Sequence, residues 1–249
     1  MTELWVWPVL LGVLGLVFGS FIATIAIRWP AERSILKGRS ACDSCGQSLA
    51  WYELAPVLSY AMQRGKCLAC GERIKPSHFY IELLAMAIGV AAGLIAPGVE
   101  GAAGAVFGWL LLALAAFDLA AYWLPNELTG AMAVTGVLTG IASLQPELVE
   151  RLIGGVAGFF VLLVAASAYR VIRGRDGLGG GDPKMLGAIG LWLGWRMLPW
   201  VVLAACVIGL TAVLVMRLSG RKLGMGDRMP FGVMLAVAAF AMWIVERFW

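Results

Sequence analysis

Residues 5–27 read WVWPVLLGVLGLVFGSFIATIAI and decide the fold, because this stretch carries no charged side chain. A helix needs about 20 apolar residues to cross the roughly 30 Å of hydrocarbon in a bilayer. No basic residue precedes the run, and no small-residue cleavage site closes it before Arg28, so we expect a retained transmembrane helix rather than a secretory signal peptide. The whole chain agrees: of its 249 residues, 61% are hydrophobic and 14% are charged, against about 25% charged in soluble domains.

Further apolar runs follow along the chain, and the mean hydropathy is +0.87. The sequence therefore predicts an all-α polytopic membrane protein with about eight transmembrane helices. We expect a first transmembrane helix over residues 1–27, a polar module over 28–78 and a transmembrane domain over 79–249. The sixth and seventh runs are divided only by Leu198-Pro199. The later runs cover residues 79–96, 101–118, 124–143, 150–172, 184–197, 198–217 and 230–248.

The basic residues are distributed unevenly between the loops. Sixteen of the 19 Lys and Arg residues fall between the first two runs, around the fifth and sixth, or between the last two. Lys and Arg collect in cytoplasmic loops, so these three regions are predicted to be cytoplasmic and both termini periplasmic. Arg151, Arg196 and Arg247 are left for the opposite face. The net charge of +4 then follows from topology, without a nucleic-acid partner.

The polar module contains two C-x-x-C-G motifs separated by 21 residues. Four thiolates at this spacing favour a closed, structural zinc site, since none of the four tetrahedral positions is left for a reacting water. Two disulfides are the alternative, but a cytoplasmic module lies in a reducing compartment. Cys206, alone in an apolar run, is predicted to be a small buried packing residue. The four predicted zinc ligands are Cys42, Cys45, Cys67 and Cys70.

Two aspartates stand out because ionisable residues at membrane depth are costly and usually functional. Asp118 ends the third run and Asp182 precedes the sixth, so both are expected near the cytoplasmic face. Two neighbouring carboxylates in a low-dielectric site share a proton. One can then accept a proton from an attacking water while the other donates a hydrogen bond to the developing oxyanion, as amide hydrolysis requires. Alternatively, Asp118 faces water at the interface and Asp182 caps the next helix ahead of Pro183.

Asp182 closes the sequence GLGGGD over residues 177–182, which contains a G-x-G-D pattern. Glycines allow backbone geometries closed to other residues and leave room for a substrate chain. The same pattern recurs over residues 224–227, so Asp227 is the second candidate for this role.

The order of these blocks resembles the prepilin peptidases, the aspartyl proteases of GxGD type that are also called type 4 prepilin leader peptidases. The resemblance covers nearly the whole chain. Ala23 replaces the family's usual Asn, Leu54-Ala55 replaces Asn-Ile, and Asn126 replaces Asp. The matching blocks are Gly19-Ser20-Phe21, Arg28-Trp29-Pro30, residues 51–60, Arg64-Gly65-Lys66-Cys67, Asp118 with Leu124-Pro125-Asn126, residues 179–184 and Pro230-Phe231-Gly232.

The resemblance implies cleavage of type IV prepilins, or of type II secretion pseudopilins, after a glycine at the cytoplasmic face of the bacterial inner membrane. It makes Asp118 and Asp182 the catalytic pair and residues 79–249 the peptidase domain, while Asp227 falls in a loop. Many members then methylate the new N-terminus with S-adenosylmethionine, for which Glu53 and Glu82 are candidate residues. The predicted substrate-binding loop comprises Gly179, Gly180, Gly181 and Lys184.

Three other functions stay open at this point. The chain could be a peptidase without methyltransferase activity. Consumption of S-adenosylmethionine would distinguish the bifunctional enzyme from a peptidase alone. An ion-coupled transporter would use Asp118 and Asp182 as cation sites, but the glycine-rich segment lies at one face rather than at the midplane. A non-enzymatic assembly scaffold would leave both aspartates unexplained. The sequence does not predict the oligomeric state.

Overall fold

The computed structural model describes residues 2–30, 41–42, 44–48, 50–175, 177–220 and 229–248. Over these ranges the chain is helical, and the only β-structure is two isolated bridges. The fold divides into two compact units, Met1–Ala116 and Phe117–Trp249. The prediction of an all-α protein is confirmed.

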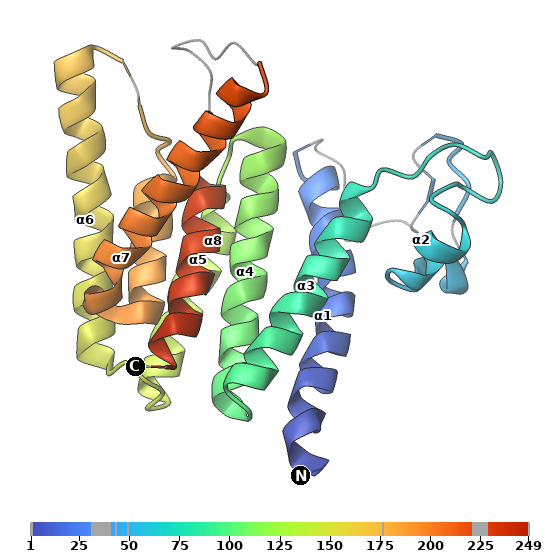
Figure 1. The fold of residues 1–249 in the computed structure, drawn as a ribbon, viewed down its shortest axis with the longest axis horizontal. Helices are drawn as coiled ribbons and strands as arrows, with labels where there is room; N and C mark the ends of the chain where they lie inside the picture. The colour runs from blue at the N-terminus through green and yellow to red at the C-terminus, as the bar shows by residue number, and fades with distance from the viewer. Residues whose placement is uncertain are drawn as a thin grey trace. The chain divides into compact units, whose positions relative to one another are not determined.

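The first unit is built on two long helices, α1 (Thr2–Arg28) and α3 (Ser77–Ile95), which lie side by side in Figure 1. Glycines allow their backbones to approach closely. A Cβ at Gly19 would lie 2.7 Å from the Cα of Glu82, and one at Gly93 would lie 2.6 Å from the backbone nitrogen of Pro8. These contacts make the two helices antiparallel. Between them the chain forms η1 (Trp51–Leu54) and α2 (Leu58–Met62), and α4 (Val99–Ala121) begins in this unit.

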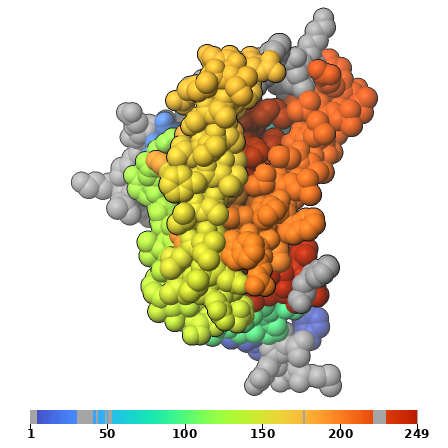
Figure 2. All heavy atoms as spheres, turned by 90° about the vertical axis from the view of Figure 1, so that its left-hand side faces the viewer, coloured from blue at the N-terminus to red at the C-terminus, as the bar shows by residue number. Residues whose placement is uncertain are grey.

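The second unit contains the end of α4 together with α5 (Asn126–Ile141), α6 (Leu148–Arg173), α7 (Asp182–Leu218) and α8 (Phe231–Glu246). Small residues again set the packing. A Cβ at Gly158 of α6 would meet the carbonyl oxygen of Leu186 at 2.7 Å, so α6 packs tightly against the first part of α7. Figure 2 shows α6 and α7 lying beside each other along one face of this unit.

Helix α7 turns back on itself at Gly194, whose φ of 67° lies in the left-handed region that favours glycine. Figure 1 shows the two arms of α7, residues 182–193 and 195–218, running in opposite directions. The prediction that Leu198-Pro199 divides these runs is therefore wrong by a few residues. Pro199 lies inside the second arm, close to its start, where the loss of one backbone hydrogen bond is best tolerated.

Each of the eight predicted apolar runs coincides with a helical segment, two of them with the arms of α7. Among the described residues, five helices are long and apolar enough to cross a membrane: α1, α3, α4, α6 and α7. Helices α5 and α8 have 16 residues each, and α8 is apolar but shorter than the others. The chain is thus a polytopic membrane protein.

One end of the second unit is organised by Arg151, a residue that the sequence analysis treated only as a charge on the opposite face. Arg151 is 2% exposed, although it carries a positive charge. Its guanidinium connects α5, the α5–α6 connection and α7. The donated bonds go to the carbonyl oxygens of Pro146 (2.7 Å), Gln145 (2.9 Å), Leu191 (3.0 Å), Gly136 (3.2 Å) and Leu144 (3.3 Å).

Candidate active site

Asp118 and Asp182 both lie in the second unit. Asp118 occupies the last turn of α4, and Asp182 is the first residue of α7. Their exposed fractions are 6% and 5%, so neither simply faces water, as the alternative interpretation of Asp118 required.

Asp118 is held by the start of α8. The backbone N–H of Val233 donates to its Oδ2 at 3.1 Å. A helix N-terminus carries unpaired N–H groups and a partial positive charge, which suits a carboxylate. A Cβ at Gly232 would lie 2.9 Å from the same oxygen, so only glycine lets the chain pass this close.

Asp182 is held by the glycine loop. The N–H of Gly179 donates to its Oδ2 at 2.8 Å, and the N–H of Asp182 returns a bond to the Gly179 carbonyl at 3.1 Å. Within the described residues the carboxylate therefore binds the loop before α7 rather than the first turn of the helix, which does not match the simple capping interpretation. In both aspartates one carboxylate oxygen is anchored by a backbone N–H.

Leu124 joins the two aspartates. A Cβ at Gly181, the neighbour of Asp182, would lie 2.8 Å from the Leu124 Cβ. A Cβ at Gly232, which touches Asp118, would lie 3.1 Å from the Leu124 Cδ2. The two glycines that lie beside the carboxylates, Gly181 and Gly232, therefore both pack against one side chain. The structure brings together the two aspartates that the sequence paired.

The remaining residues of the predicted substrate loop lie beside this pair. Lys184 is exposed, and its Nζ donates to the Oδ1 of Asn126 at 2.8 Å, which ties the start of α7 to the start of α5. Gly180 has open space where a side chain would be. Asp227 lies outside the described residues.

Two parts of the site were not recognised as such in the sequence: the Val233 N–H and the contact of Gly232 with Asp118. The only signal for them was the Pro230-Phe231-Gly232 block, which matched the family without a physical role. The structure gives the block that role, because it delivers the start of α8 to Asp118.

We expect Gly232→Ala to reduce the activity of the aspartate pair by about 10- to 100-fold, because a displacement of about 1 Å at a reacting group costs this much. The added methyl group would push against the Asp118 carboxylate and Leu124. Gly130→Ala is the matched control, since a Cβ at this position of α5 meets nothing within 4 Å. Equal activities of the two variants would show that the fit of Gly232 against Asp118 does not matter.

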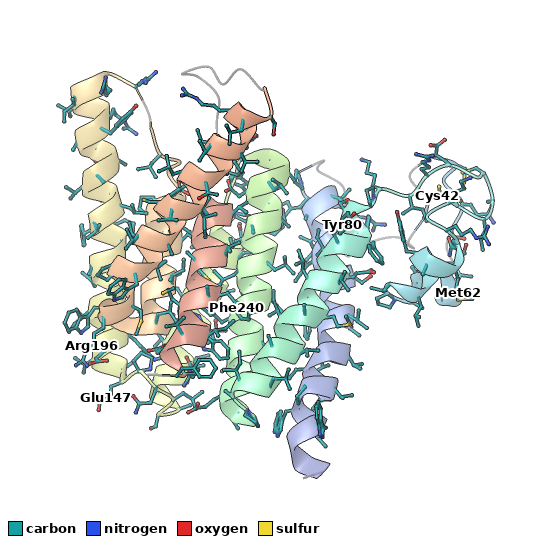
Figure 3. The ribbon with its side chains drawn as sticks, viewed as in Figure 1. Cys42, Met62, Tyr80, Glu147, Arg196 and Phe240 are labelled. Atoms are coloured by element: carbon teal, nitrogen blue, oxygen red, sulfur yellow. The ribbon has the colours of Figure 1, made fainter. Side chains whose placement is uncertain are left out.

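The four predicted ligand cysteines form a second site, in the first unit. The described residues of the two C-x-x-C-G motifs make the same closing hydrogen bond: Gly46 N–H donates to Cys42 O and Gly71 N–H to Cys67 O, each at 2.9 Å. Both glycines are left-handed, with φ of 73° and 72°, which explains the Gly after each second cysteine. All four Sγ atoms lie within 4.8 Å of one another, and none is in a disulfide. This is a candidate metal centre; Cys42 is labelled in Figure 3.

The electrostatics of the four thiols favour a bound cation. Backbone N–H groups of Cys45 and Ser44 lower the pKa of Cys42 to about 7. The N–H of Glu72 favours the thiolate of Cys70 as well, but burial and the three neighbouring thiols raise the pKa of Cys70 to about 12. Four thiolates at this separation repel one another, so a metal ion is needed for all four to be ionised together.

Cys206 does not belong to this site. It is exposed on the second arm of α7, so the prediction that it is buried is wrong. In a membrane protein an exposed position on an apolar helix faces lipid. Cysteine behaves as a small hydrophobic residue, so its thiol is compatible with a lipid environment.

Glu53 and Glu82, the candidate methyltransferase residues, both lie in the first unit and line one cavity of about 240 Å³. Each is bound by the backbone of the segment that joins the two cysteine motifs. The N–H of Ala50 donates to Glu53 Oε2 and the N–H of Val57 to Glu82 Oε2, both at 2.7 Å.

The fold and the two sites define a class: a polytopic membrane protein with a pair of buried carboxylates and a separate four-cysteine centre. Family models agree in detail. The Bacterial Peptidase A24 N-terminal domain matches residues 13–95, and the Type IV leader peptidase family matches residues 105–214. The chain belongs to the type IV leader peptidase family, an aspartic protease family, and is an enzyme of the bacterial inner membrane.

Curated relatives carry the name prepilin leader peptidase/N-methyltransferase. The protein of Burkholderia pseudomallei strain K96243 is 37% identical over 92% of this chain and 82% of its own length. The Klebsiella pneumoniae protein is 35% identical over 80% and 90% of the two chains, and the Dickeya chrysanthemi protein is 34% identical over 94% and 90%. No solved structure matches the chain significantly.

Proposed function

We propose that the protein cleaves the leader peptide of type IV prepilins or pseudopilins after a glycine, with Asp118 and Asp182 as the catalytic pair. The observation that carries this proposal is that both carboxylates are buried and lie beside glycines, Gly232 and Gly181, that pack against the same side chain, Leu124. Residues 79–249 would form the peptidase domain, and the module over 28–78 would support it.

The pair would act by sharing one proton. The ionised carboxylate accepts a proton from a water molecule as the water attacks the scissile carbonyl, and the protonated carboxyl donates a hydrogen bond to the developing oxyanion. When the tetrahedral intermediate collapses, the amine of the new N-terminus leaves with a proton from the pair. The N–H groups of Val233 and Gly179 fix one oxygen of each carboxylate, which leaves the other oxygen for water or substrate.

The substrate would lie partly in lipid. Its apolar helix packs beside the enzyme, and the residues around the scissile bond lie extended against Gly179, Gly180 and Gly181, with Lys184 at the rim. The open space at Gly180 supports this path. The pair lies at the end of the unit where α6 ends in Arg170 and Arg173 and where the second arm of α7 ends in Arg217. The positive-inside rule makes this the cytoplasmic face, with both termini periplasmic.

Zinc is the metal that we propose for the four-cysteine centre. A tetrahedral site with metal–sulfur distances of about 2.3 Å separates its sulfurs by about 3.8 Å. The Sγ atoms of Cys42 and Cys70 are 3.9 Å apart. The ion would hold the two motifs together, since a polar segment of this length has little core of its own.

We expect Cys42→Ser to lose most of its bound zinc, because three thiolates and a hydroxyl bind zinc far more weakly than four thiolates. Elemental analysis of the purified protein measures this directly. Cys206→Ser is the matched control and should keep about one zinc per chain. Equal zinc contents in the two variants would contradict a site made by the four cysteines.

N-methylation of the new N-terminus is the second proposed activity, with S-adenosylmethionine as the donor. It is favoured by the name of the relatives and by the cavity in the first unit that Glu53 and Glu82 line. A peptidase without this activity would consume no S-adenosylmethionine. The transporter alternative is disfavoured, because both aspartates lie at one end of their helices rather than at mid-depth.

Incubation of the purified protein with a prepilin, followed by weighing of the product, tests both activities together. Loss of the leader and gain of a methyl group give separate mass changes. An unaltered prepilin would reject the proposed function. A cleaved but unmethylated product would support the peptidase activity and reject the methyltransferase activity.

A further inference from the structure

We propose that α2 and the basic residues that follow it form a membrane-surface site. The apolar side of the helix enters the bilayer interface, and the basic residues bind anionic lipid headgroups, so the partner is a lipid surface. All of the residues involved lie in the first unit. The inference goes beyond the proposed peptidase and methyltransferase activities and does not depend on either.

Helix α2 presents its two sides in the opposite sense to a helix on the surface of a soluble protein. None of its five residues is buried. Leu58 and Met62, which share a side because they are four positions apart, are 65% and 84% exposed. Ser59, Tyr60 and the following Gln63 are half-buried and line the cavity of the first unit. A helix in water turns its apolar side inward, so this arrangement indicates an apolar environment on the outer side of α2.

Contacts with α3 set the depth of α2 in the membrane. The N–H of Val57, just before α2, donates to the Oε2 of Glu82 at 2.7 Å, and Tyr60 stacks on Phe79 with ring centroids 5.1 Å apart. The candidate membrane span of α3 begins at Ser77. Because a helix rises about 1.5 Å per residue, Glu82 lies about 7.5 Å along α3 from this point. Interfacial helices bury their apolar side about 5–10 Å into the boundary of headgroups and acyl chains, which is the depth of this contact.

A tyrosine of α3 supports the same level. Tyr80 is exposed and lies in the first turn of α3, and tyrosines are enriched where a membrane helix meets the headgroups. Figure 3 shows Met62 below both Cys42 and Tyr80, on the side toward which α3 runs. Of these labelled side chains, Met62 is therefore the one that lies furthest toward the bilayer core.

Basic residues complete the surface. Arg64 and Lys66 follow α2, Arg73 and Lys75 precede α3, and all four are exposed. Residues 58–76 contain one acidic residue, Glu72. Each Lys or Arg near an anionic leaflet strengthens binding by about fivefold. A bilayer supplies both an apolar layer and negative headgroups beside α3, and this charge complementarity favours lipid over a protein as the partner.

Photo-crosslinking of the full-length protein in nanodiscs of phosphatidylglycerol and phosphatidylcholine tests the inference. The photoreactive residue p-benzoylphenylalanine replaces Met62, or Leu58 as a second position on the same side. Gln47 is the matched control: it is also exposed, but it lies in the first cysteine motif, where its carbonyl accepts the N–H of Cys42 at 2.9 Å. We expect lipid adducts, read as the added mass of one phospholipid, to be about tenfold more frequent at positions 58 and 62 than at position 47, because an interfacial side chain lies among acyl chains.

The same assay measures the role of charge. Neutralising both basic residues after the helix, by Arg64→Gln together with Lys66→Gln, should lower the yield of lipid adducts at position 62 by about fivefold or more, as should nanodiscs of phosphatidylcholine alone. The zinc content should stay at the wild-type level in every variant, which shows that the module is still folded.

Equal yields of lipid adducts at positions 62 and 47 would overturn the inference. Adducts of position 62 with a second copy of the chain, in place of lipid, would overturn it in favour of self-association. A yield at position 62 that does not change with the charge of the lipid or of the two basic residues would contradict the binding of anionic headgroups.

Discussion

Asp118→Asn and Asp182→Asn are each expected to reduce the rate of prepilin cleavage by about 1,000-fold or more, because general acid–base groups contribute about 10²–10⁴-fold and these two act as a unit. An amide can neither take a proton from water nor share one with its partner. For the same reason the double variant should be no slower than either single variant. Time courses of leader removal in isolated membranes measure all three rates.

The control is Asp227→Asn, which follows the second G-x-G pattern and should cut at the wild-type rate. Both aspartates of the pair are buried, and each accepts a hydrogen bond from a backbone N–H. The side-chain oxygen of Asn can accept the same hydrogen bond, so the variants should remain folded in the membrane. An inactive Asp227→Asn together with an active Asp182→Asn would mean that the other loop carries the catalysis.

Arg151→Met is expected to lower the free energy of unfolding by roughly 3–5 kcal/mol, which is the usual cost of removing one partner from a buried charged interaction. Methionine has a similar length but donates no hydrogen bond. Five backbone carbonyls from α5, the α5–α6 connection and α7 would lose their donor. The midpoint of thermal unfolding in detergent should fall clearly, although the residue is remote from the aspartates in the fold.

Arg196→Met is the matched control for this measurement. Arg196 forms an ion pair with Glu150 at 2.9 Å, but its side chain is 68% exposed. Exposed ion pairs contribute about 0–1 kcal/mol, so this variant should unfold almost like the wild type. Figure 3 places Arg196 and Glu147 at the end of the unit where α6 begins, which makes it a fair comparison. Equal losses in the two variants would show that the buried hydrogen bonds of Arg151 are not what stabilises this end.

The transmembrane helices could be predicted because a long uncharged segment in a bilayer has few possible structures other than a helix. The reversal of α7 could not be placed correctly, because proline is the visible helix breaker in this stretch while the chain turns at Gly194. A left-handed φ leaves no mark on the sequence beyond the glycine itself, and other glycines lie in the same arm.

The two aspartates could be selected as candidates from the sequence because charge at membrane depth is rare and usually functional, and their catalytic role stays a prediction. Their supports could not. The contact between Gly232 and Asp118 joins residues more than 100 positions apart and depends on how α8 meets the end of α4. Sequence patterns of helical period describe one element at a time, so contacts between the ends of elements stay hidden.

Arg151 shows the same limit for a charged residue. In the sequence it counts only as one charge on the face opposite to the basic loops, and its burial follows only from the fold of the α5–α6 connection around its guanidinium. Its carbonyl partners carry no side-chain signal at all.

The claim that an aspartate pair activates water to cut a leader peptide is tested most directly by single-turnover cleavage of a purified prepilin in ¹⁸O-enriched water, with both fragments weighed. The wild-type enzyme should release a leader that ends in glycine and carries one ¹⁸O atom in its new carboxylate, whereas Asp118→Asn and Asp182→Asn should return the prepilin intact. A labelled leader produced by either variant at close to the wild-type rate would contradict the account.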